Sequence, residues 1–168
     1  YTTNYVARSM VMKKTDVIGL VVPSIDNQFM SELAYYAEMS ARSHGYNIML
    51  CNSGPDLKQE KTVVKLLLGR QVDGILIVPQ SPKTYENIRA YTDRVPTVFL
   101  SENLRDQPQS YVAVDNSHGT YLGVEYLYRL GHRRILYLGR RQSTTHQLRA
   151  EGYARACRQF GLQERFLN

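Results

Sequence analysis

The chain has 168 residues, 43% of them hydrophobic, which is enough for one substantial core or two small lobes. Its net charge is +6, and eight arginines against two glutamates lie between residues 133 and 165. Such a balance permits binding to nucleic acid or to an anionic ligand, although solvated helix faces explain most arginines of this kind. No apolar run approaches the ~18 residues that a membrane span needs, so no membrane-spanning helix is predicted.

Cysteine usage and the start of the chain bear on the compartment. Cys51 and Cys157 lie far apart in different predicted elements, and no Cys/His cluster has the spacing of metal ligands. No secretory signal pattern opens the chain. We therefore expect a reduced, cytoplasmic protein with neither a disulfide scaffold nor a metal or other cofactor. Because the first residue is Tyr1 rather than Met, we also expect the chain to begin partway into a longer protein.

The most informative stretch follows the first sixteen residues. Residues 17–22 (Val-Ile-Gly-Leu-Val-Val) are apolar-rich without alternation, which predicts a strand buried on both faces, as in a parallel sheet. Pro23 ends it, because proline cannot donate to a ladder, and Asp26 or Asn27 is then in place to cap a helix. Ligands of open α/β sheets bind just outside the carboxyl ends of the strands, so residues 24–30 are the first candidate for a binding surface.

Helical and strand patterns alternate along the rest of the chain. Helices are predicted over residues 29–44, 57–70, 83–92, 117–130 and 146–160. Strands are predicted over residues 47–51, 72–78, 95–100, 111–114 and 134–138. The first helix has its apolar face at Phe29, Leu33, Tyr36, Ala37 and Ala41. Consecutive βα units predict an α/β fold with a parallel sheet and right-handed crossovers.

The chain divides into three predicted parts. Residues 1–16 stand apart from the sheet as a short helix followed by a linker, with a frayed terminus as the alternative. Residues 17–116 form a first lobe. The regular alternation of strands and helices ends at the polar loop over residues 101–109, and the boundary between the lobes is predicted at Asn116/Ser117. Residues 117–168 open a second lobe whose remainder we expect to be missing.

Several segments, in this order, resemble the LacI/GalR family of transcriptional regulators. They are Val6–Met10, Ile18–Pro23, Asn27–Met30, Val72–Ile75, Val114–Asn116, Gly119–Gly139 and Arg149–Tyr153. The resemblance covers nearly the whole chain. It implies a two-lobed, periplasmic-binding-protein-like fold and the effector-sensing part of a homodimeric repressor. It also implies a DNA-reading helix-turn-helix before Tyr1 and the rest of the second lobe after Asn168.

The resemblance further implies an effector site in the cleft between the lobes, at the ends of the strands. The implied contacts are Asp26, Gln28, Phe29, Met30, Pro79, Gln80, Ser81, Ser101, Asp115, Ser143, Thr145 and Arg149. These residue types fit a small polar ligand, a sugar or related metabolite, because Phe29 offers an aromatic face and Arg149 a planar fork of donors. Sugar-binding members often have aspartate where this chain has Ser101, and Glu102 is the alternative acceptor.

Six of these residues also have a purely structural interpretation. The alternatives are core packing for Phe29 and Met30, turn formation for Gln80 and Ser81, an ion pair with Glu151 for Arg149, and a helix cap for Asp115.

The segment Val6–Met10 resembles the hinge helix of the family, which becomes ordered on operator DNA. The resemblance implies that Arg8 faces phosphates and that Met10 wedges between base pairs in the minor groove. Lobe geometry would then bias whether this short helix forms.

Two other classes of protein are alternatives to a regulator. A solute-binding protein of a transport system shares the two-lobed architecture, but the hinge-like Val6–Met10 argues against it. An enzyme of the doubly wound type would need a glycine-rich phosphate loop after the first strand, where this chain has Pro-Ser-Ile-Asp-Asn-Gln. His118, His132 and His146 lack an evident nucleophile or paired carboxylate, so catalysis is not expected.

Overall fold

The computed structural model describes residues 14–81, 83–101, 108–139 and 144–167. They belong to two compact units, which are the described parts of Tyr1–Leu100 with Leu104–Val112 and of Ser101–Asn103 with Ala113–Asn168. Each unit is described by itself below. The predicted hinge residues Arg8 and Met10 lie outside the described residues, and the division into lobes at Asn116/Ser117 stays a prediction.

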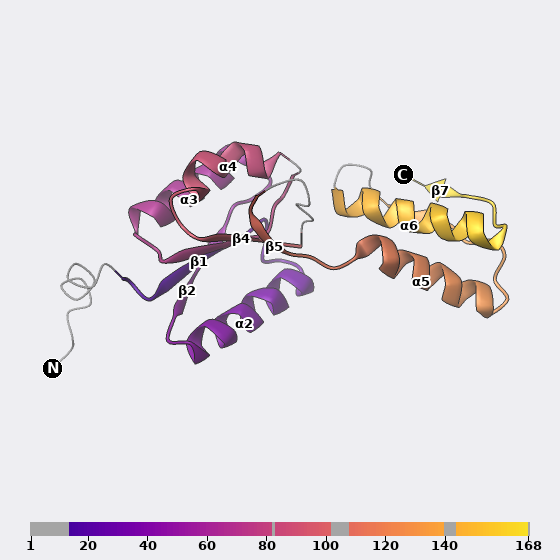
Figure 1. Cartoon of the computed structure of the whole chain (residues 1–168), viewed down its shortest axis with the longest axis horizontal. Coiled ribbons are helices and arrows are strands. Elements are labelled where there is room, and N and C mark those ends of the chain that lie inside the picture. Colours follow the sequence, from indigo (N-terminus) through magenta and orange to yellow (C-terminus); the bar gives the residue numbers. More distant parts are fainter. Residues whose placement is uncertain (1–13, 82, 102–107, 140–143, 168) are drawn as a thin grey trace. The chain divides into compact units, whose positions relative to one another are not determined.

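The first unit is a five-stranded parallel sheet with the strand order β2-β1-β3-β4-β5. Its strands are β1 (Val17–Val22), β2 (Asn47–Asn52), β3 (Gly74–Ile77), β4 (Thr97–Leu100) and β5 (Ser110–Val112). Its helices are α2 (Gln28–Ser43), α3 (Leu57–Gly69) and α4 (Thr84–Thr92). Figure 1 shows α3 and α4 on one face of the sheet and α2 on the other. The predicted α/β fold with a parallel sheet is therefore confirmed.

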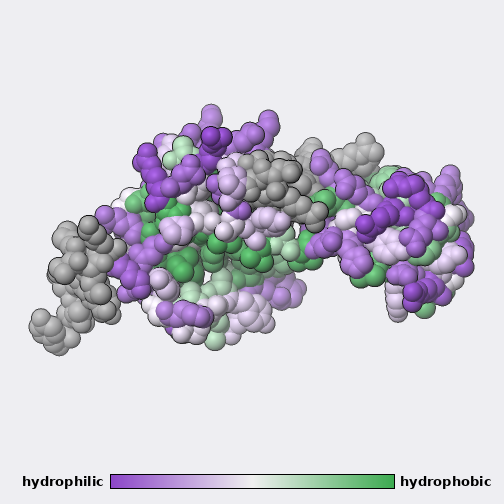
Figure 2. Space-filling model, in the orientation of Figure 1, coloured by the Kyte–Doolittle hydropathy of each residue, from purple (hydrophilic) through white to green (hydrophobic). Residues whose placement is uncertain are grey.

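Alternate residues of β1 belong to the two cores on either side of the sheet. Val21 packs in the cluster beneath α3 and α4, whereas Leu20 and Val22 belong to the cluster beneath α2. All three side chains are fully buried, which confirms a strand covered on both faces. Figure 2 shows apolar residues gathered over the middle of this unit, between the hydrophilic outer faces of its helices.

Helix α2 begins where the sequence predicted, but its packed face is rotated. The Asn27 side chain caps the helix by accepting from the Met30 N–H at 2.9 Å. The side chains of Leu33 and Ala37 pack on the sheet as predicted, together with those of Met30 and Ala34.

Phe29 and Tyr36, predicted on the apolar face of α2, are 55% and 67% exposed. Each stands one residue before a packed position, Met30 and Ala37, and one residue turns the helix by about 100°. The predicted face was therefore wrong at these two positions.

The amino end of β1 is fastened to the loop before β3. Thr15 and Asp16 donate their N–H groups to the two carboxylate oxygens of Asp73 at 3.0 and 2.9 Å. The Thr15 hydroxyl also donates to Asp73 Oδ1. Asp16 has a left-handed backbone, φ 54°, which is uncommon for a residue with a side chain. We call the contacts of Thr15 and Asp16 with Asp73 the Asp73 strap.

The second unit pairs two long helices with a short sheet. It contains α5 (Asn116–Arg129), β6 (Tyr137–Leu138), α6 (Thr144–Phe160) and β7 (Phe166–Leu167), and β6 and β7 run parallel. Strand β7 was not predicted. The hydroxyl of Tyr153 donates to the Ile135 carbonyl and accepts the Arg165 N–H, both at 2.8 Å, and thereby joins α6 to the segments leading into both strands.

Helices α5 and α6 meet at Gly152. A Cβ atom added there would lie 2.0 Å from the carbonyl oxygen of Ser117, so only glycine allows this approach of the two backbones. In the described part of the chain, neither these helices nor any other is long and apolar enough to cross a membrane.

Candidate functional site

The loops that follow β1, β3 and β4 begin at one edge of the five-stranded sheet. These strands run parallel, so their carboxyl ends meet at the edge where ligands of open α/β sheets bind. The loops begin at Pro23, Val78 and Ser101 respectively. The structure thus brings the three predicted first-lobe loops to a common edge.

The β1–α2 loop is an ordered turn with polar groups exposed. The Ser24 hydroxyl donates to Asp26 Oδ1, and the Asp26 N–H donates back to Ser24 Oγ at 3.2 Å. Gln28 Nε2 donates to Glu32 Oε1 at 2.8 Å, one turn along α2. Phe29 is exposed, while Met30 packs against the core. The structural interpretation therefore holds for Met30 and fails for Phe29.

The β3–α4 loop combines turn contacts with an unsatisfied donor. Ser81 accepts the Thr84 N–H through its carbonyl at 2.9 Å and the Lys83 N–H through its hydroxyl at 3.2 Å, so it does form a turn. Gln80 differs, because its Nε2 is buried and has no hydrogen-bond partner among the described residues. A buried amide nitrogen without an acceptor costs free energy unless something else satisfies it.

Glu60 lies behind this loop and was not recognised from the sequence. It belongs to the first turn of α3, and its side chain is 0% exposed. Its carboxylate accepts the Thr84 hydroxyl at 2.9 Å, the Asn87 Nδ2 at 3.4 Å and the backbone N–H of Gln80. Desolvation raises the pKa of the Glu60 carboxyl, and the three hydrogen bonds oppose that rise.

Ser101 follows β4 in a strained conformation. Its φ of 64° lies in the left-handed region, which costs about 1 kcal/mol or more for a residue other than glycine. Its predicted neighbour in binding, Glu102, lies outside the described residues. Gln109, just before β5, has a buried Oε1 without a partner in the described part of the chain.

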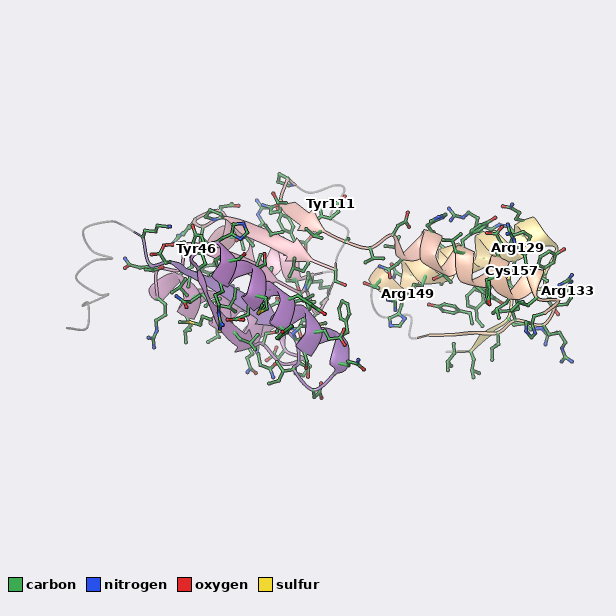
Figure 3. All side chains as sticks on the ribbon, turned by 90° about the horizontal axis from the view of Figure 1, so that it is seen from below. Tyr46, Tyr111, Arg129, Arg133, Arg149 and Cys157 are labelled. Carbon is green, nitrogen blue, oxygen red and sulfur yellow. The ribbon has the colours of Figure 1, made fainter. Side chains whose placement is uncertain are left out.

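In the second unit two of the predicted residues, Asp115 and Arg149, lie at the amino end of α5. Asp115 caps α5 by accepting the His118 N–H at 2.9 Å, which confirms its structural role. Arg149 is exposed on α6, and its Nε donates to Asn116 Oδ1 at 2.9 Å. Figure 3 shows Arg149 at the opposite end of the helix pair from Arg129 and Arg133.

Thr145 is half-buried in the first turns of α6, whereas Ser143 lies outside the described residues. The contact between Arg149 and Asn116 could not be predicted, because only the fold brings together two residues 33 positions apart.

The described residues offer little for metal or thiol chemistry. They contain no group of three His, Cys, Asp or Glu side chains able to hold a metal ion. Burial raises the pKa of the Cys51 and Cys157 thiols, which disfavours the nucleophilic thiolate.

Comparison with known proteins identifies the family. Residues 15–167 match the family described as periplasmic binding proteins and sugar binding domain of LacI family. The transcriptional regulator RegA of Clostridium acetobutylicum is 32% identical over 135 residues, which are 78% of this chain and 40% of RegA. The chain spans about half the length of the curated relatives it matches.

Two solved structures share the fold. The periplasmic binding protein/LacI transcriptional regulator of Alkaliphilus metalliredigens, complexed with D-xylulofuranose, has a TM-score of 0.78 at 30% identity, covering 90% of this chain and 56% of that one. The lac repressor dimer bound to operator and the anti-inducer ONPF has a TM-score of 0.85 at 26% identity, covering 99% and 60%. The chain therefore belongs to the family of periplasmic binding proteins and LacI-type sugar-binding domains.

Proposed function

We propose that the chain senses a small sugar or related metabolite for a LacI-type transcriptional repressor, and that the bound effector changes the affinity of the whole protein for operator DNA. The observation that carries this proposal is the buried, unpartnered Nε2 of Gln80 at the carboxyl edge of the sheet. A hydroxyl or carbonyl oxygen of a sugar is the kind of acceptor that such a donor lacks.

The residues proposed to bind the effector are, in the first unit, Asp26, Gln28, Phe29, Met30, Gln80 and Ser81. In the second unit they are Ser101, directly after β4, and Asp115, Ser143, Thr145 and Arg149. Aromatic and bidentate polar groups of this kind hold sugars by stacking and by paired hydrogen bonds.

The relatives support a regulator over a transport protein or an enzyme. RegA is named as a transcriptional regulator, and the lac repressor structure is a dimer on operator. By analogy we propose a homodimer in the cytoplasm, with Arg8 and Met10 in a hinge that contacts operator DNA. The effector shifts the repressor only by its difference in affinity for the two lobe arrangements.

A thermal-shift titration of the full-length protein tests the sensor. The panel holds D-xylulose, other pentoses, hexoses, sugar phosphates and nucleosides. A ligand at ~100 times its dissociation constant should stabilise the protein by about 2.7 kcal/mol. Arg149→Ala should abolish this shift. Arg158→Ala is the matched control, because Arg158 is on the same helix and pairs with Glu164 instead.

The thermal shifts of the two variants distinguish the possible outcomes. A shift that Arg149→Ala removes and Arg158→Ala retains supports the proposed site. A ligand-induced thermal shift that persists in Arg149→Ala would refute the role of Arg149. The absence of a thermal shift with every compound of the panel would refute a sugar or related metabolite as the effector.

A further inference from the structure

We infer that Glu60 is a positioning residue for the effector loop between β3 and α4, holding the backbone of Gln80 at the carboxyl edge of the sheet. The inference rests on the proposed function, since it assigns a role to Glu60 in the same site. Glu60 comes from α3 and need not touch the ligand.

The first support is the burial of a carboxyl group where the sequence pattern of α3 does not require one. Glu60 is fully buried beside apolar positions of the same helix, Val64 and Leu67. Burying a carboxyl group is costly unless its oxygens accept hydrogen bonds. We therefore attribute the presence of a glutamate at this buried position to the hydrogen bonds that its carboxylate oxygens accept.

The second support is the identity of the donors. They lie on two different segments: the backbone N–H of Gln80 in the loop, and the side chains of Thr84 and Asn87 on α4. Asn87 Nδ2 also donates to the Leu57 carbonyl at 2.8 Å, which ties α4 back to the start of α3. One carboxylate thus fixes both ends of the loop that carries Gln80 and Ser81.

The third support is the state of the loop itself. Ser81 closes a turn onto Lys83 and Thr84, so the loop has a defined path between the two points that Glu60 holds. The Gln80 side chain on this path keeps a buried donor free among the described residues. A donor whose backbone is fixed in advance loses less entropy when a ligand accepts from it.

The groups that act on the Glu60 carboxyl from the loop and from α4 are neutral: the Gln80 amide, the Thr84 hydroxyl and the Asn87 amide. Glu60→Gln keeps the shape of the side chain but replaces one acceptor oxygen by a donor. That donor then faces groups that are themselves donors, so at least one bond to the loop or to α4 is lost.

The test compares full-length wild type with Glu60→Gln and with Glu86→Gln, an exposed glutamate of α4 as the matched control. Amide hydrogen exchange is followed in residues 79–84 and, for reference, in β1. Loss of one charge-assisted hydrogen bond should speed exchange of the loop by about tenfold or more while β1 keeps its protection. The affinity for D-xylulose should fall by a similar factor in Glu60→Gln only.

Two further readouts separate positioning from general stabilisation. The Gln80 amide chemical shift should titrate with the Glu60 carboxyl in wild type and lose that titration in Glu60→Gln. Should Glu60→Gln fail to fold, Thr84→Val removes one of the three bonds and should loosen the same loop, while Thr84→Ser keeps the hydroxyl and should behave as wild type.

Unchanged loop exchange in Glu60→Gln, or equal acceleration in the loop and in β1, would overturn the inference. So would D-xylulose binding of equal strength in wild type and Glu60→Gln. If wild type does not bind D-xylulose, that result counts against this sugar in the proposed function, and the exchange and chemical-shift readouts still decide the role of Glu60.

Discussion

Replacing Gly152 by alanine probes the closest approach of α5 and α6. The new Cβ would lie 2.0 Å from the Ser117 oxygen, 2.8 Å from its carbonyl carbon and 3.0 Å from its Cα. All three are backbone atoms, so no side chain can rotate away. The two helices must separate by about 1 Å at this point, because real Cβ contacts are not shorter than 3.0 Å.

The magnitude follows from two opposing effects. Overpacking a well-packed contact costs about 1–3 kcal/mol, and a backbone obstacle favours the upper end. Alanine regains about 1 kcal/mol of helix propensity over glycine. The net loss in free energy of unfolding should be about 2 kcal/mol, which lowers the melting temperature of a chain of this size by roughly 4–8 °C.

Gly123→Ala is the matched control, since Gly123 lies within α5 and a Cβ there meets nothing within 4 Å. It should stabilise the chain by about 1 kcal/mol. Thermal denaturation followed by circular dichroism measures both variants, and amide exchange should show the Gly152→Ala loss in α5 and α6 but not in α3. Gly152→Ala as stable as Gly123→Ala would refute the reasoning.

Three other substitutions test separate contacts. The folded pKa of Glu60 lies above its ordinary value of 4.5, so the contribution of Glu60 to stability is fully present below that value and is lost as pH rises through the folded pKa. Glu60→Gln should therefore weaken the dependence of the urea midpoint on pH between acid and neutral pH. An unchanged dependence would contradict this prediction. Tyr153→Phe leaves a carbonyl and an N–H unpaired and should lower the free energy of unfolding, measured by urea denaturation, by about 1–3 kcal/mol. Tyr126 is 64% exposed, so the control Tyr126→Phe should change that free energy by no more than about 0.5 kcal/mol. Equal effects of the two substitutions would count against the Tyr153 contacts. Asn27→Ala should cost about 1 kcal/mol by the same assay and Asn27→Asp much less, and equal losses would show that the cap does not act through its side-chain oxygen.

Local patterns predicted most of the first unit. The apolar run of β1, the proline after it and the Asn27 cap each act within a few residues, so the sequence contains their full cause. Phe29 and Tyr36 were misplaced because apolar spacing alone does not tell which of two adjacent helical stripes meets the sheet. Strand β7 was missed since two residues, Phe166 and Leu167, become a strand only by pairing with β6.

The candidate site was predictable in its loops but not in its supports. Parallel strands bring their carboxyl ends together whatever the side chains are, so Gln80 and Ser101 could be assigned to one edge. Glu60 could not be recognised, because a glutamate in the first turn of a helix is most often solvated. Its burial depends on donors 20 to 27 positions away, and no local pattern encodes such a meeting.

The Asp73 strap has a consequence for how this domain can change. It lies at the amino end of β1, whereas the loops of the proposed effector site lie beyond the carboxyl ends, about 20 Å away for a strand of six residues. Substitutions in the loops of the proposed effector site therefore leave the contacts of Thr15 and Asp16 with Asp73 unchanged. Loops from relatives can be grafted at residues 23–27 and 79–83 while the Asp73 strap is kept. The residues of the proposed effector site and the contacts that fasten the amino end of β1 can therefore change independently of each other.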